Sequence, residues 1–209
     1  MANSRAFTKF ETSVARSITL IRNYRRLIIF SKNAGKKVFA PKDLIRASVV
    51  LSVAALDAYI TDVFSEKLVP YLKKYKPDEE LVMILQKSGL DTREALNLIQ
   101  MDRPFRRIRN LVNKYYSTYT TQRFEVIDSL FLAYRLKNIT KMAEKKSGRM
   151  TLKRSVELLI QRRHKIVHEG DYNSHNKLIS IDEIQMKKRI NDLKLLVKCL
   201  DEIICNRIK

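Results

Sequence analysis

The sequence predicts an all-α protein, and two observations carry that prediction. Only four Gly and four Pro punctuate 209 residues, so the chain lacks the turn-forming residues that many short strands require. Apolar residues also recur at three- and four-residue spacing over long stretches, which is typical of amphipathic helices. A chain of this length fits one hydrophobic core. We therefore expect a single helical domain spanning residues 1–209.

Apolar spacing predicts the first two long helices. The first runs to about Phe30 because its apolar residues share one face. That face holds Phe7, Phe10, Val14, Ile18 and Ile21. After a loop, a second helix begins near Asp43 and runs to about Tyr75. Pro70 is a candidate break in it, because proline cannot donate a backbone hydrogen bond.

Three features of the sequence favour a cytoplasmic protein. Residues 47–60 are the most apolar part of the chain, but they are too short and, with Asp57, too charged to span a bilayer. We expect them to form a buried core helix. The first residues lack the apolar core of a signal peptide. Cys199 and Cys205 lie on different faces of one predicted helix and cannot pair with each other, which fits a reducing compartment.

Shorter helices follow, and capping residues predict where they begin. Asp78, in an acidic first turn, opens a third helix that stops at Gly89. Asp91, with Glu94 three residues later, predicts a capping box for a fourth. The remaining apolar patterns predict helices near residues 105–116, 126–134 and 139–143, from residue 151 into residues 161–173, and near residues 181–208.

The charge balance indicates nucleic acid as the leading class of partner. The chain holds 42 Lys and Arg against 22 Asp and Glu, which gives a net charge of +20. Such an excess attracts polyanions and releases counterions when phosphates bind. Many single lysines only solvate helix surfaces, but mixed signs would serve solvation equally well. The surplus as a whole therefore favours a partner rich in phosphate.

Residues 105–116 combine basic side chains with aromatic ones. Arg106, Arg107 and Arg109 could track phosphates while neighbouring aromatic rings stack on bases. The alternative is a partly exposed helix whose aromatics lie in the core, because helical cores also need aromatic side chains.

Residues 161–173 contain two of the three histidines of the chain. His164 and His168 are four residues apart and stack on one helix face, a spacing that can hold a metal. A third ligand is missing, because His175 lies in a predicted loop, and neighbouring cations would repel a metal ion. We therefore expect no metal and no cofactor. Histidines at a helix end can also simply cap backbone carbonyls.

Arg163 and His168 are five residues apart, which in an ideal helix is about 140° around the axis and roughly 7.5 Å along it. They do not share one stripe. They could flank one cleft if the helix ends near His168, which Gly170 favours because glycine readily adopts the left-handed conformation that ends helices. They could also meet their counterparts from a second copy across a two-fold axis.

The segment Arg-His-Lys-Ile-Val-His at residues 163–168 resembles the signature of the HEPN superfamily (higher eukaryotes and prokaryotes nucleotide-binding), which is an arginine, a polar residue, a spacer and a histidine. Residues 44–60 resemble the second helix of its RiboL-PSP branch, and residues 126–136 resemble its middle segment. Residues 166–171, with the long last helix, are similar to its C-terminal half. The resemblance covers most of the chain.

This resemblance implies an antiparallel helical bundle of the HEPN type, with additional helices between the core hairpins, that forms a homodimer. It also implies a metal-independent endoribonuclease. Arg163 and His168 carry over as the catalytic pair, His164 as the residue that orients them, and Asp57 as an acid that pairs with Arg163. Some members have a Tyr two residues after the histidine, but Gly170 stands there in this chain, so control by modification of that Tyr is not expected.

The residue types fit this chemistry. Histidine changes its charge near neutral pH and can act as base or acid, and arginine meets phosphate oxygens with a planar fork. We expect a toxin or anti-phage effector that acts on RNA, with an antitoxin or defence protein as a further partner. The alternative is a non-catalytic module of the same fold that binds nucleic acid or protein. The basic residues expected to contact RNA are Arg106, Arg107, Arg109, Arg162 and Lys165.

Overall fold

The computed structural model describes residues 3–33, 41–117 and 119–208, and within these residues it contains nine α-helices and no β-strand. The prediction of an all-α protein is therefore confirmed. The helices are α1 (Arg5–Asn33), α2 (Asp43–Lys74), α3 (Glu79–Lys87), α4 (Thr92–Ile99), α5 (Pro104–Tyr116), α6 (Phe124–Leu132), α7 (Ile139–Ser147), α8 (Leu152–His168) and α9 (Glu183–Arg207).

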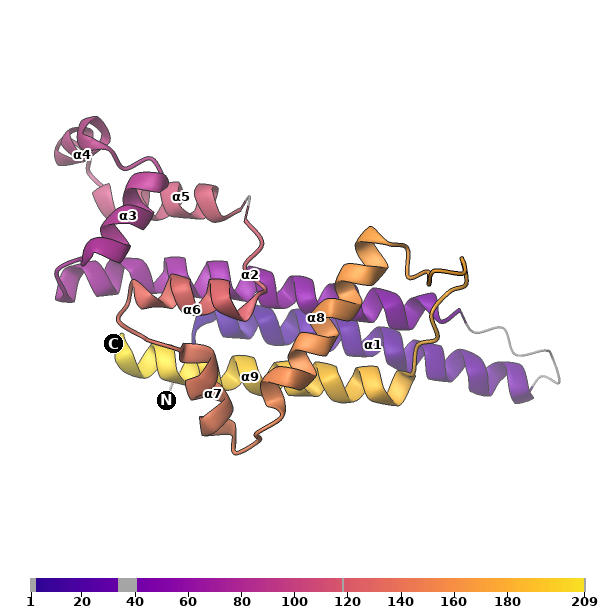
Figure 1. Cartoon of the computed structure of the whole chain (residues 1–209). Helices are drawn as coiled ribbons and strands as arrows, with labels where there is room; N and C mark the ends of the chain where they lie inside the picture. The colour runs from indigo at the N-terminus through magenta and orange to yellow at the C-terminus, as the bar shows by residue number, and fades with distance from the viewer. Residues whose placement is uncertain (1–2, 34–40, 118, 209) are drawn as a thin grey trace.

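Three long helices, α1, α2 and α9, lie side by side along the length of the molecule, and α1 runs antiparallel to α2 (Figure 1). Helix α8 crosses α2 and α9 obliquely and packs against both (Figure 1). Helices α3, α4 and α5 gather at the end of α2 that is far from its start (Figure 1). The bundle thus exposes the last turns of α8 on one flank.

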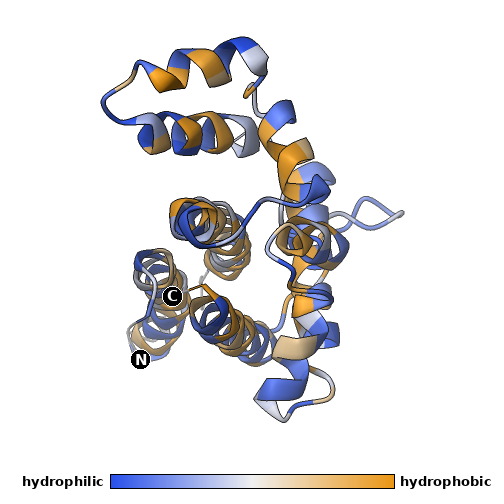
Figure 2. Ribbon diagram, turned by 90° about the vertical axis from the view of Figure 1, so that its left-hand side faces the viewer, coloured by the Kyte–Doolittle hydropathy of each residue, from blue (hydrophilic) through white to orange (hydrophobic). Residues whose placement is uncertain are grey.

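The core forms where apolar faces of the long helices meet. Seen along the bundle, hydrophobic segments of neighbouring helices face one another (Figure 2). Tyr59, Phe64 and Tyr134 are among the large side chains that are fully enclosed. The rings of Phe64 and Tyr134 stack with their centroids 4.6 Å apart, which joins α2 to the turn after α6. Burial of such rings is a large source of stability.

Pro70 does not break α2, which continues through it to Lys74. The lost backbone hydrogen bond is confined to one turn near the end of the helix. Leu68 and Tyr71, on either side of the proline, are buried in the core. Their packing holds the last turn in helical form.

The predicted starts of the third and fourth helices are confirmed, but of the capping box at the fourth helix only the bond to Asp91 forms. The Asp78 side chain accepts a hydrogen bond from the Leu81 N–H, and the Asp91 side chain accepts one from the Glu94 N–H at 2.8 Å. The Glu94 carboxylate accepts from Arg107 at 2.6 Å, so this side chain links α4 to α5. That hydrogen bond lowers the pKa of Glu94.

Helix α2 is long and apolar enough to pass a composition test for a membrane span, although residues 47–60 alone suggested otherwise. However, 56% of its most apolar window is buried inside the fold. The core helix of a folded domain passes the same test, and that is the position α2 occupies here.

Candidate active site

Helix α8 presents one face to the core and leaves its last turns exposed. Leu152, Val156 and Leu159 are buried against the bundle, whereas His164 and His168 are exposed. The helix ends at His168, and Gly170 follows with φ +61°. This confirms that the helix stops at Gly170, since glycine adopts left-handed backbone at little cost. The histidines therefore lie at a fixed, open helix end.

A cavity of about 640 Å³ lies between α8 and the segment that leads into α6. Arg163, His164 and His168 all line it. The other lining residues are Tyr119, Thr120, Gln122, Arg123, Phe124, Glu125, Val126, Glu157, Ile160 and Gln161. Arg163 and His168 thus flank one cavity although they do not share a helix stripe. The ending of α8 at His168 makes this possible, as the sequence suggested.

The two histidines of the cavity lie beside each other, with ring centroids 4.6 Å apart and ring planes inclined by 41°. Both are exposed, so neither is a core histidine. Among the residues that the structure describes, no group of three His, Cys, Asp or Glu side chains could hold a metal ion. The third histidine, His175, is not among the residues that line the cavity.

Arg163 lines the cavity and also has a buried nitrogen without a partner in the described part of the chain. Its Nε is enclosed and has no hydrogen-bond partner among the described residues. A buried N–H donor without an acceptor is costly, so such groups usually bind a partner in the working state of a protein. Phosphate oxygen is an acceptor that suits a guanidinium well.

Asp57 was expected to pair with Arg163, but its carboxylate binds Thr121 instead. It accepts hydrogen bonds from the Thr121 N–H at 2.5 Å and from the Thr121 hydroxyl at 2.6 Å. Thr121 is buried, and its neighbours Tyr119, Thr120 and Gln122 line the cavity. Asp57 therefore fixes the cavity wall opposite α8, because it ties this wall to α2.

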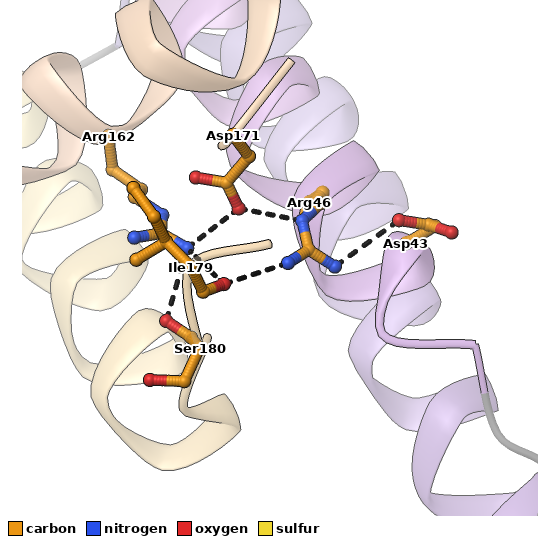
Figure 3. Close-up of polar contacts among 6 residues, drawn as sticks. All are labelled: Asp43, Arg46, Arg162, Asp171, Ile179 and Ser180. Carbon is orange, nitrogen blue, oxygen red and sulfur yellow. Dashed lines mark hydrogen bonds and ion pairs between the residues drawn. The ribbon is translucent and has the colours of Figure 1, made fainter. Parts of the chain in front are cut away.

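Arg162 was expected to bind RNA, but it points to the interior of the fold (Figure 3). Its Nη2 donates to Asp171 Oδ2 at 2.7 Å, and Arg46 Nε donates to the same oxygen at 2.7 Å. Asp171 is fully buried, and only 13% of the Arg162 side chain is exposed. Arg46 and Arg162 also donate to the Ile179 carbonyl. A role in RNA binding does not fit this position.

We call Arg46, Arg162 and Asp171 the buried clamp. It joins the start of α2 to the chain just after α8, so it fixes the turn that follows His168 (Figure 3). Positive charge is concentrated around it: burial, together with the charge of Arg162, lowers the pKa of Arg189. No local pattern predicts the buried clamp, because Arg46 and Asp171 are 125 residues apart in the chain.

The basic residues of α5 are not brought to the cavity. Arg106, Arg107 and Arg109 are all exposed, on a helix that packs on α2, α3 and α4 (Figure 1). Arg107 is paired with Glu94. Lys165 is exposed on α8 next to the site. These four cations are accessible to a polyanion, and only Lys165 lies on the site helix.

The sequence left two roles open for the aromatic residues near α5, which are packing in the core and stacking on bases. Tyr116 is buried in the core, as the structural alternative expected. Tyr119 is 51% exposed and lines the cavity.

Glu157 and Gln161 also line the cavity, although the sequence did not identify them as site residues. Together with His164 and His168 they occupy positions i, i+4, i+7 and i+11, which lie on one face of a helix. This spacing is the sequence signal that could have identified them.

Comparison with known proteins identifies a family for this chain. A family model described as RiboL-PSP-HEPN matches residues 18–206, which run from the middle of α1 to the last turn of α9. No curated protein and no solved structure matches the chain. The matched region contains both walls of the cavity and the buried clamp. The chain belongs to the RiboL-PSP branch of the HEPN superfamily.

Proposed function

We propose that this protein is a metal-independent endoribonuclease that cleaves RNA by attack of a ribose 2′-hydroxyl on the adjacent phosphate. The observation that carries the proposal is that Arg163, His164 and His168 line one cavity. Family membership supports a nucleotide-binding, ribonuclease-like module. The net charge of +20 favours an RNA substrate, because counterion release drives binding of phosphate chains.

The proposed reaction needs a base, an acid and a cation. One histidine takes the proton of the 2′-hydroxyl while the 2′-oxygen forms a bond to phosphorus. The bond from phosphorus to the 5′-oxygen breaks, and a protonated histidine gives its proton to that oxygen. Arg163 binds the phosphate oxygens as negative charge builds on them. The products are a 2′,3′-cyclic phosphate and a 5′-hydroxyl.

Access to the phosphate follows from the exposure of the two histidines. Both rings open to solvent at the end of α8, so an extended RNA strand can reach them. Arg163 is more enclosed, and its Nε lacks a partner among the described residues. A phosphate bound between Arg163 and the histidines would offer acceptors to the guanidinium group.

The proposal includes a homodimer in which the cavities of two copies face each other across a two-fold axis. Its support is that His164 and His168 are exposed at a helix end, with Val167 46% exposed between them. Two copies would offer two arginines and four histidines around one groove. Light scattering at micromolar concentration should give twice the chain mass. An active protein that is strictly monomeric would remove this part of the proposal.

The biological part of the proposal is a cytoplasmic toxin or anti-phage effector that an antitoxin or defence partner restrains. A ribonuclease that needs no cofactor is active wherever RNA is available, which favours such restraint. Induced expression of the chain should arrest growth, and His168→Ala should relieve the arrest. Equal arrest by both proteins would oppose the proposed role.

A non-catalytic RNA-binding module is the second candidate, and one observation favours it. The Asp57 carboxylate binds Thr121, and this arrangement does not pair it with Arg163. Purified protein should be mixed in EDTA with RNA and with DNA of the same sequence. The ribonuclease proposal expects cleavage of RNA alone and a 2′,3′-cyclic phosphate at the new end. Salt-sensitive binding without cleavage would favour the module.

A further inference from the structure

We propose that the cavity contains a nucleobase subsite, formed by Tyr119, Glu157 and Gln161, for the nucleotide next to the cleaved phosphate. It selects a base with N–H donors on its Watson–Crick edge, and guanine fits best. This inference rests on the proposed function, because it places a phosphate at the other end of the same cavity.

The chemistry of the cavity changes along α8. Its last turns supply Arg163, His164 and His168, whereas the preceding turns supply Glu157 and Gln161. With a rise of about 1.5 Å per residue, Gln161 precedes His164 by about 4.5 Å and Glu157 precedes it by about 10 Å. The distance from a phosphate to the base of its own nucleotide lies between these two separations. The negative charge of Glu157 repels phosphate, so the phosphate is directed to the cationic end.

Tyr119 provides a stacking surface on the opposite wall. Its ring is 51% exposed, and its centroid lies 4.7 Å from that of Tyr115. The Tyr115 hydroxyl donates to the Tyr119 hydroxyl at 3.0 Å. Two residues later, Thr121 is tied to Asp57. The ring thus rests against that of Tyr115 while about half of the residue remains exposed, and stacking of a base on such a ring contributes about 1–3 kcal/mol per base.

Glu157 is available to read a base. It forms an ion pair with Arg154 at 3.2 Å, in which both side chains are about half exposed or more. Exposed pairs of this kind contribute little, so Glu157 can exchange Arg154 for a ligand at small cost. Gln161 adds a donor and an acceptor one turn later, and Ile160 and Phe124 provide apolar lining between the walls.

The hydrogen-bonding groups favour guanine over uracil. A carboxylate only accepts, and its two oxygens match two adjacent N–H donors. Guanine presents such a pair at N1 and N2, whereas adenine and cytosine present one amino group and uracil presents a single N3–H. Replacement of Glu157 by glutamine replaces one acceptor oxygen with a donor and removes the charge. The preference for guanine should then be lost.

The test measures binding without cleavage. Fluorescence anisotropy with 2′-O-methyl RNA hexamers, which lack the attacking hydroxyl, is carried out at fixed salt with one central base varied. Wild type should bind the guanine hexamer roughly tenfold tighter than the uracil hexamer, which corresponds to about 1.4 kcal/mol. Glu157→Gln should reduce that ratio to below about 3. Tyr119→Leu should weaken all four hexamers by roughly tenfold.

Matched controls separate the subsite from general effects. Glu79→Gln changes an exposed glutamate of α3, and Tyr172→Leu changes a tyrosine that is 50% exposed outside the cavity lining. Both should retain the wild-type base preference. Circular dichroism should show that all variants are folded.

The outcomes distinguish failure of the subsite proposal from failure of the ribonuclease proposal. Equal affinity of wild type for the four hexamers would overturn the subsite, even if RNA cleavage depends on His168. An unchanged preference in folded Glu157→Gln would do the same. A preference that Glu157→Gln removes, in a protein that cleaves no RNA, would support the subsite and reject the nuclease. His168→Ala should lose cleavage and keep the base preference.

Discussion

Replacement of Asp171 by asparagine is expected to lower the free energy of unfolding by about 3 kcal/mol. The carboxylate is fully buried and accepts from Arg46 and Arg162, each at 2.7 Å, through a single oxygen. Removing one partner of a buried ion pair typically costs about 3–5 kcal/mol, because the remaining charges stay buried. Asparagine can still accept both hydrogen bonds, which places the expected loss at the lower end of that range.

The substitution changes the charge of the side chain without straining the backbone. Asp171 has φ +62°, a conformation that asparagine also tolerates. Asp43→Asn is the matched control, because Asp43 also pairs with Arg46, at 3.3 Å, but its side chain is 79% exposed. Exposed pairs contribute about 0–1 kcal/mol. The same substitution against the same arginine should therefore have a small effect.

The assay is urea unfolding followed by circular dichroism, with the slope of the transition compared between variants. The buried clamp also fixes the turn after His168, so Asp171→Asn should reduce RNA cleavage at temperatures where it remains folded. A loss below about 1 kcal/mol, or a loss equal to that of Asp43→Asn, would refute the reasoning that burial makes this carboxylate important.

Three further predictions follow from the cavity walls and the charge. Thr121→Val removes the hydroxyl that donates to Asp57, so cleavage should fall and thermal unfolding should show a loss of about 1 kcal/mol, whereas Thr121→Ser should retain both properties. Gly170→Ala should destabilise the fold by about 1–2 kcal/mol in urea titrations, because φ is +61° and the new Cβ would lie 3.2 Å from the Tyr172 ring. Gly148→Ala is the control, because Gly148 also has positive φ but open space around it. Its effect shows how much of the destabilisation comes from the backbone conformation alone. RNA affinity should fall roughly 30-fold between about 50 and 200 mM salt if three or four phosphates are contacted, and Arg109→Ala should make that slope shallower if α5 contacts RNA; a salt-independent affinity would contradict the electrostatic account.

Local sequence signals predicted most of the helices and the end of the site helix. Asp78 and Asp91 begin α3 and α4 because their side chains bond to N–H groups three residues later. Gly170 ends α8 because it follows the last helical turn in left-handed conformation. Each signal acts within a few residues, so a single sequence is enough to read it.

Contacts between distant residues could not be predicted in the same way. The buried clamp joins residues 125 positions apart, and the bond between Asp57 and Thr121 joins residues 64 positions apart. A charged residue on a helix gives the same local pattern whether it faces water or a buried partner. For this reason Arg162 was expected to bind RNA. The pairing of Asp57 with Arg163 was expected from the family resemblance, which does not show which partner a side chain has in this chain.

The central claim is that Arg163 and His168 cleave RNA without a metal. The most direct measurement is the rate of cleavage of one labelled RNA in EDTA by wild type and by His168→Ala and Arg163→Ala. The matched controls are His175→Ala, which changes the histidine outside the cavity, and Arg22→Ala, which changes an exposed arginine of α1. Loss of a catalytic acid or base, as in His168→Ala, typically costs about 10²–10⁴-fold, and loss of a group that stabilises developing charge, as in Arg163→Ala, costs about 10²–10³-fold. Both site variants should therefore lose at least about 100-fold while the controls retain wild-type rates. Equal rates in all five proteins would contradict the account.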